Sequence, residues 1–222
     1  MNVLRLLRVL SMKRVVFVFG MMMLSAGVAQ AGVLTTLNFG SDGVDSGQGP
    51  SAPPGVYCPP SGGTITPCFK DKAETFAGQG TIEHVTLTAT ISNSFSLIEP
   101  SLYLAHAGLT VHLYEALIHG TSTGAGSVTI TFDDLAAAPL PTSPTLASGT
   151  FRPDSPLSAL NGLDASGTWI LTIGDWNPGD ISSYSGAVLA VTTPEPATLA
   201  LLVVGLAVLS GSVAWRKGRS IR

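Results

Sequence analysis

Basic residues are scarce in the middle of this chain. Between Gly32 and Pro196 there are fourteen Asp and Glu but only three bases, Lys70, Lys72 and Arg152. Three positive and fourteen negative charges give this segment a formal charge of −11, which the whole-chain value of −3 conceals. Phosphate groups repel so acidic a segment, which argues against nucleic acid or anionic lipid as partners. The charge suits divalent cations or cationic partners, or it serves solubility alone.

Catalytic patterns are also scarce, and we predict that the chain is not an enzyme. There is no paired-histidine metal motif and no phosphate-binding glycine loop, and histidine occurs only four times. We interpret His106, His112 and His119 as surface or loop residues rather than metal ligands. His112 alternates with Val111 and Leu113, which predicts an outward position on a strand.

Cysteine occurs only twice, at Cys58 and Cys68, with nine residues between them. Two cysteines at this spacing without a nearby histidine lack the pattern of a zinc site. In an exported protein, which meets an oxidising compartment, such a pair is predicted to form a disulfide. The bond would contribute ~2–3 kcal/mol by restricting the unfolded chain.

The N-terminal end has the parts of a secretory signal. Lys13 and Arg14 precede an apolar run over residues 15–24, and the small residues Ala29 and Ala31 form a signal-peptidase site before Gly32. We therefore expect residues 1–31 to be a signal peptide that signal peptidase removes. Translation starts at Met1 or at Met12, since a start at Met12 gives a signal of ordinary length.

The C-terminal end combines a short acidic motif, an apolar run and a basic end. Pro194, Glu195 and Pro196 precede residues 197–215, which contain no charge and are long enough for a helix to cross a membrane. Four bases follow this run and favour a cytoplasmic C-terminus. On hydrophobicity alone, the segment is either a plain single-pass anchor or a processed tag.

Residues 193–222 resemble the PEP-CTERM sorting signal of Gram-negative bacteria. In that family a Pro-Glu-Pro motif, an apolar helix and an Arg-rich end are recognised together by an exosortase, an integral-membrane cysteine transpeptidase. The resemblance implies cleavage near Pro194 to Pro196. The upstream domain would pass through an inner-membrane intermediate to the cell surface or the extracellular matrix.

Between the two ends, apolar residues alternate with polar ones, which is typical of half-buried strands. Turn signals rich in Gly, Pro, Asn and Asp separate the runs. An all-β sandwich is predicted, whereas residues 32–80, which contain the Cys58–Cys68 loop, are expected to be irregular and residues 136–148 to form an exposed loop. The alternating runs are residues 85–91, 109–113, 128–132, 169–173 and 188–191.

A second resemblance covers residues 81–192. The segments 130–134 (Ile-Thr-Phe-Asp-Asp), 149–153 (Gly-Thr-Phe-Arg-Pro) and 167–175 (Gly-Thr-Trp-Ile-Leu-Thr-Ile-Gly-Asp) resemble the P domain, or Homo B domain, of proprotein convertases. That family implies a jelly-roll β-sandwich. In proteases the P domain lies next to a subtilisin-like catalytic domain and supports its folding. The domain also occurs without a catalytic domain in bacterial secreted proteins.

Two positions depart from the P-domain pattern. The family has a Gly-Asp-Leu step where this chain has Ala107-Gly108-Leu109, and a Trp in the last strand where it has Ala187. We expect Tyr184 to fill part of the space of the missing Trp. The resemblance therefore supports the sandwich and no shared surface site.

Four aspartates at strand ends are candidate calcium ligands: Asp133 and Asp134 follow one strand, and Asp175 and Asp180 flank the turn at residues 177–179. Carboxylate and carbonyl oxygens are the ligands that Ca²⁺ uses in proteins. Aspartates at such positions also cap turns through side-chain hydrogen bonds. Both interpretations stay open at this point.

Three functions fit the sequence. The first is an exported, non-catalytic surface or matrix module that binds a polysaccharide or a protein. The second is a P-domain accessory module of a separate secreted subtilisin-like serine protease. The third is an uncleaved single-pass protein of the envelope.

Overall fold

The computed structural model describes residues 32–45, 56–58, 67–77, 80–97, 99–115, 124–141, 147–177 and 179–194. These residues form ten strands and a short 3-10 helix, η2 (Leu157–Leu160). The predicted signal peptide at residues 1–31 and the apolar run at 197–215 lie outside the described residues. Within the described part of the chain, no helix is both long and apolar enough to cross a membrane.

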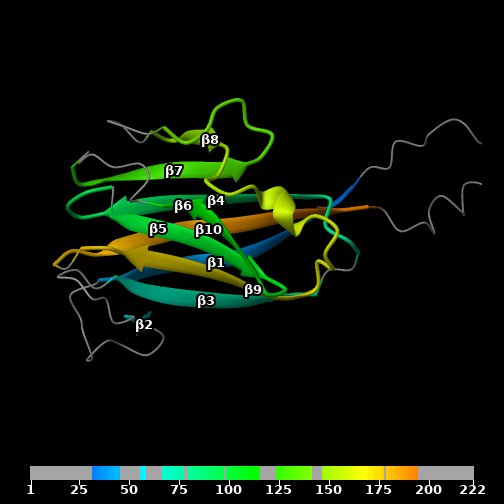
Figure 1. Ribbon diagram of the computed structural model, residues 1–222, viewed down its shortest axis with the longest axis horizontal. Coiled ribbons are helices and arrows are strands. Elements are labelled where there is room, and N and C mark those ends of the chain that lie inside the picture. The colour runs from blue at the N-terminus through cyan, green and yellow to red at the C-terminus, as the bar shows by residue number, and fades with distance from the viewer. Residues whose placement is uncertain are drawn as a thin grey trace, which may run out of the picture. The chain divides into compact units, whose positions relative to one another are not determined.

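The strands form two five-stranded sheets (Figure 1). All neighbouring strands are antiparallel except β7 and β8, which are parallel. Sheet A has the order β1 (Val33–Val44), β10 (Ser182–Thr193), β4 (His84–Asn93), β7 (Gly126–Asp133) and β8 (Gly149–Phe151). Sheet B has the order β2 (Val56–Tyr57), β3 (Cys68–Phe76), β9 (Gly167–Asp175), β5 (Pro100–His106) and β6 (Leu109–Tyr114).

The alternating runs form strands as predicted. In β4 the residues Val85, Leu87, Ala89 and Ile91 are buried, and the polar residues between them are partly exposed. The inward side chains of both sheets join in one hydrophobic cluster, in which Trp169 is the largest fully buried residue. The predicted β-sandwich is confirmed, because each sheet buries one face in this shared core.

The last strand contains a bulge that brings two predicted core positions to the same side. Tyr184 and Ala187 are both buried, although residues three apart on a regular strand point to opposite faces. The pairing of β10 with β4 shifts register between Ser185 and Val188, and Gly186 has φ +59°. The bulge therefore allows both side chains to face the core. The Tyr184 ring lies in the same strand as the small Ala187 side chain, which stands where P domains have a Trp.

The prediction that residues 32–80 are irregular is wrong. The segment contains β1, which pairs with β10, and β3, which pairs with β9, so the sandwich extends from Val33 to Thr193. Both strands lie at or near a sheet edge, where fewer side chains are buried and the apolar alternation is weak. In β1, register shifts around Gly40 interrupt the alternation further.

Candidate functional site

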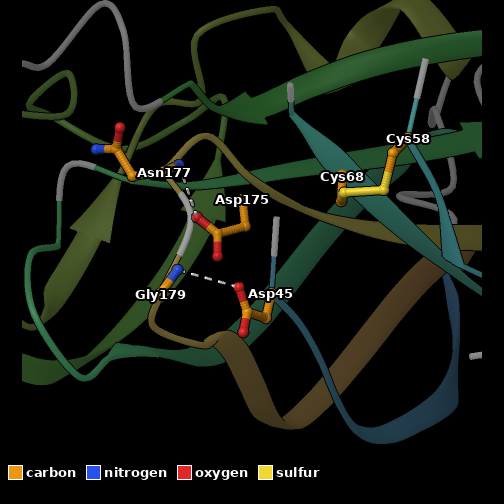
Figure 2. Close-up of a disulfide and its surroundings, with 6 residues drawn as sticks. All are labelled: Asp45, Cys58, Cys68, Asp175, Asn177 and Gly179. Atoms are coloured by element: carbon orange, nitrogen blue, oxygen red, sulfur yellow. Dashed lines mark hydrogen bonds between the residues drawn. A yellow bond between two sulfur atoms is a disulfide. The ribbon is translucent and has the colours of Figure 1, made fainter. Parts of the chain in front are cut away.

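The predicted disulfide between Cys58 and Cys68 is present (Figure 2). It joins the residue after β2 to the first residue of β3, and the two Cα atoms lie 4.2 Å apart. β2 pairs with β3 through only two residues. The disulfide therefore adds a covalent link that holds this short strand beside β3. No free cysteine exists in the chain.

Asp133 and Asp134 act as hydrogen-bond acceptors for the backbone. Asp133 accepts from the Leu135 N–H at 2.8 Å and lies 3.2 Å from His84 Nε2. Asp134 accepts from the N–H groups of Leu157 and Ser158 at 2.9 and 2.7 Å, which fixes the start of η2. These contacts are those of the turn-capping interpretation.

Asp175, at the end of β9 in sheet B, and Asp180, before β10 in sheet A, lie at the opposite end of the sandwich from Asp133. Asp133 pairs with Thr86 near the start of β4, whereas Ser182, two residues after Asp180, pairs with Asn93 at the end of β4. The four aspartates therefore do not converge on one site. Asp175 is fully buried and accepts a hydrogen bond from the Asn177 N–H at 3.2 Å (Figure 2).

The turn between β9 and β10 carries an acidic pocket, which sequence reasoning did not find. Glu99 and Asp180 line a pocket of about 310 Å³ together with Phe95, Asn177 and Gly179. The Asp180 Oδ2 atom is buried and has no hydrogen-bond partner among the described residues. On the rim, Asp45 accepts from the Gly179 N–H at 3.3 Å (Figure 2).

Burial and the neighbouring carboxyl of Asp180 raise the pKa of Glu99. Glu99 is only 3% exposed, and it accepts hydrogen bonds from Asn177 Nδ2 at 3.0 Å and from Asn93 Nδ2 at 3.2 Å. Two carboxyls in one pocket disfavour ionisation of both, which agrees with the raised pKa of Glu99. Within the described residues, no group of three His, Cys, Asp or Glu is arranged to hold a metal ion.

His106 is buried, so its interpretation as a surface or loop residue is wrong. Its ring stacks on Trp169 with centroids 4.0 Å apart, and its two nitrogens lie 3.1 Å from Thr168 O and 2.7 Å from Asp164 O. Carbonyl oxygens only accept, so a ring nitrogen that carries hydrogen donates to the carbonyl it faces. His106 therefore packs in the interior beside Trp169. His112 is exposed, as predicted, and His119 lies outside the described residues.

A Gly-x-Ser-x-Gly spacing, which is typical of a hydrolase nucleophile, occurs once, at residues 120–124. Residues 120–123 lie outside the described residues. In a nucleophile elbow the serine stands between a strand and a helix. Here the next described element is the strand β7, which begins at Gly126, and no helix lies within the described residues 124–141.

The sorting motif follows directly from an interior strand of sheet A. β10 is paired with both β1 and β4 and ends at Thr193, and Pro194 is the last described residue. Val33 pairs with Thr193, so the beginning of β1 and the end of β10 lie side by side (Figure 1). Glu195, Pro196 and the apolar run lie outside the described residues.

Comparison with known proteins identifies the C-terminal end. Residues 192–219 match the family model described as the PEP-CTERM protein-sorting motif. The chain therefore carries an exosortase sorting signal, which implies export and sorting to the cell envelope in Gram-negative bacteria. No curated protein matches the chain.

Eight chains among the solved structures match this chain. One of them is in the crystal structure of the complex between the Aeromonas sobria serine protease and a chaperone. It is 13% identical with a TM-score of 0.37, and the match covers 79% of this chain but only 29% of that chain. A similarity of this size carries no activity over to this chain. The P-domain resemblance is carried by the residue motifs, and the two-sheet sandwich agrees with it.

Proposed function

We propose that the chain is an exported, non-catalytic surface or matrix module, delivered through its tail and active outside the cell. The observation that carries this proposal is the sorting motif at residues 192–219, which begins where the last strand of a complete sandwich ends. Signal peptidase would cleave before Gly32, and an exosortase would process the chain near Pro194 to Pro196.

Three features of the described residues support the proposal. The Cys58–Cys68 disulfide suits an oxidising compartment. Val33 pairs with Thr193, so the two ends of the sandwich lie side by side, as suits a domain that would be processed at both ends. The acidic character of the domain keeps it away from anionic lipid after release.

Two alternatives use the same fold. A P-domain accessory module would dock to a separate secreted subtilisin-like protease, and a pull-down from the culture medium that recovers such a protease would favour it. An uncleaved anchor would keep residues 197–215 in the inner membrane. We rank the accessory module lower because the P-domain motifs support the sandwich and no shared surface site. We rank the uncleaved anchor lower because a plain anchor does not need a Pro-Glu-Pro motif.

Mass spectrometry of the C-terminus tests the proposal. Membrane, outer-surface and medium fractions are compared for the natural chain and for a Pro194→Ala/Pro196→Ala variant. We expect a C-terminus near residue 194 on the surface for the natural chain, and retention of Arg222 in the membrane for the variant. The same double change at Pro53 and Pro54 is the matched control and should sort normally. An intact Arg222 in every fraction would falsify the proposal.

A further inference from the structure

Four aromatic side chains gather on the outer side of sheet B, and we call this cluster the aromatic face: Tyr57, Phe69, Tyr103 and Trp176. The Phe69 ring is central, with its centroid 5.5 Å from that of Tyr57, 6.1 Å from that of Tyr103 and 6.2 Å from that of Trp176. Tyr57 and Phe69 are stacked, whereas the Tyr103 and Trp176 rings meet Phe69 edge on. The members come from β2, β3, β5 and the residue after β9.

The strand register places these rings outside the core. Leu102 and Leu104 of β5 are fully buried in the shared core, and Tyr103 between them points the other way and is only partly buried. None of the four aromatic residues belongs to the core cluster. Tyr57 is 50% exposed, so at least one ring of the aromatic face is widely open to solvent.

Glycine at position 174 allows the Phe69 ring to lie on the sheet. Phe69 pairs with Gly174, and a Cβ atom built there would lie 2.8 Å from two atoms of the Phe69 ring. Trp176 is fixed by a hydrogen bond of 2.7 Å from its Nε1 to Ser101 Oγ. The aromatic face is therefore held in place by the backbone and by a hydroxyl, not only by ring contacts.

Carboxylates border the aromatic face. Asp71 accepts a hydrogen bond from Thr172 Oγ1 at 2.6 Å, and Glu115 accepts one from the Tyr103 hydroxyl at 3.2 Å. Burial, and then the Asp71 carboxylate, raise the pKa of Tyr57, and burial is the main cause that raises the pKa of Tyr103 to about 12. Both phenols are thus protonated donors near neutral pH.

Positive charge is absent from this side of the described sheet. On β3 the outward positions are those of Phe69, Asp71, Ala73 and Thr75, while the two lysines of this strand have the opposite parity and bind carboxylates. The outward positions of the described parts of β5, β6 and β9 hold no Lys or Arg. The charged groups beside the rings are carboxylates, with the His112 imidazole 3.0 Å from Glu115.

We propose that the aromatic face binds a polysaccharide without acidic groups. The C–H bonds on one side of a sugar ring carry a small positive charge, and they pack on the negative face of an aromatic ring. Carboxylate and phenol groups beside the rings can hydrogen-bond the sugar hydroxyls, which is the usual composition of a ligand site. An acidic polymer would be repelled by Asp71, Glu115 and the overall negative charge. The inference rests on the proposed function, because it needs the domain outside the cell.

Binding of three polymers to the full-length protein in mild detergent tests the proposal. Hydroxyethyl cellulose is neutral, chitosan is basic and alginate is acidic, and affinity electrophoresis measures the retardation by each. We expect retardation by the neutral or the basic polymer and none by alginate. Tyr57→Ala should weaken the retardation about tenfold, as expected for the loss of one stacking ring, and Tyr57→Phe should restore most of it.

The matched control is Thr90→Ala, which removes a side chain from the outer side of sheet A and should bind as the natural chain does. Thermal unfolding confirms that Tyr57→Ala is folded. Retardation by alginate alone, by none of the three polymers, or equally in Tyr57→Ala would overturn the proposal. So would a dimer, seen by sedimentation, that Tyr57→Ala dissociates. Sorting is measured separately at the C-terminus, so failure of the proposed function is distinguishable from failure of this inference.

Discussion

The outer sides of the two sheets have the same strand geometry and opposite surface chemistry. On sheet A, threonine hydroxyls pair across strands, with Thr88 Oγ1 2.9 Å from Thr131 Oγ1 and Thr90 Oγ1 2.8 Å from Thr129 Oγ1. On sheet B, aromatic rings gather around Phe69. Threonine pairs bind each other and need no further partner, whereas the aromatic face keeps apolar surface in contact with water. Function is therefore expected on sheet B.

The shared core does not explain this difference. Inward positions on both sheets are restricted by packing, because the interior is filled by a single cluster. Outward positions are free of that restriction, so the residue types found there reflect the function of the surface rather than the packing of the core. The two sides of the sandwich are therefore expected to differ in stability and binding as well as in composition.

Removal of the disulfide should have the largest effect. Cys58→Ser/Cys68→Ser is expected to lower the free energy of unfolding by ~2–3 kcal/mol, because the bond closes a short loop in the unfolded chain. It should also free β2 and Tyr57 from the aromatic face and weaken polysaccharide binding. Thermal unfolding measures the loss of stability, near-ultraviolet circular dichroism the release of Tyr57, and affinity electrophoresis the binding. An unchanged melting temperature would contradict the role assigned to the bond.

Gly174→Ala should destabilise the aromatic face directly. The added Cβ would lie 2.8 Å from the Phe69 ring, so the ring must shift, at an expected cost of about 1–3 kcal/mol. The matched control is Gly126→Ala on sheet A, where a Cβ would be 3.4 Å from Leu97, an ordinary contact. Denaturant unfolding of both variants checks the prediction, and equal losses would remove the distinction between the sheets.

Asp180→Asn tests the turn that crosses from sheet B to sheet A. Because the pKa of Glu99 is raised, its stabilising contribution is present below the ordinary Glu range and is lost as pH rises through the raised pKa. Removing the Asp180 charge should therefore raise the melting temperature at pH 7, and the gain should shrink as pH falls toward 4. If the rise in melting temperature caused by Asp180→Asn is larger at low pH than at pH 7, the direction given for the pKa of Glu99 is wrong.

Calcium is tested at the same turn. Of the four candidate calcium ligands, Asp133 and Asp134 accept hydrogen bonds from the backbone. Asp180 Oδ2 is buried without a hydrogen-bond partner among the described residues, so it is the oxygen to which a cation could bind. We propose that excess Ca²⁺ raises the melting temperature of the natural chain and leaves Asp180→Asn unchanged. If calcium and a chelator give the same melting curve for the natural chain, the calcium proposal is wrong.

Thr88→Val should have the smallest effect. It removes one hydroxyl pair on the outer side of sheet A, and a single exposed or half-buried hydrogen bond contributes only ~0.5–1.5 kcal/mol. Thr131→Val and the double variant complete a cycle that isolates the pair. Polysaccharide binding should stay unchanged in all three variants, and a loss of binding would place the ligand on sheet A instead.

Much of the fold could be predicted from the sequence, because apolar and polar residues alternate in β4, β6, β7 and β9. β1 and β3 were missed since strands at or near an edge bury less. The burial of His106 had a readable signal, because it has the same parity as Leu102 and Leu104. The disulfide was predicted from compartment and spacing.

The aromatic face and the acidic pocket could not be predicted in the same way. Phe69 meets Gly174 only because β3 pairs with β9, and Glu99 meets Asp180 only because a turn between sheets brings them together. Such contacts depend on strand order and register, which alternation alone does not give. The sequence shows which residues face outward but not which of them are neighbours.

The position of β10 has a mechanical consequence for the membrane-held intermediate that the proposed function includes. The tail continues from a strand that is hydrogen-bonded on both sides, to β1 and to β4. A pull on the tail along the strand axis therefore loads both ladders in shear, so many hydrogen bonds resist together instead of breaking one after another. While the tail is still held in the membrane, the domain can thus bear drag from the surrounding medium without being pulled open at its point of attachment.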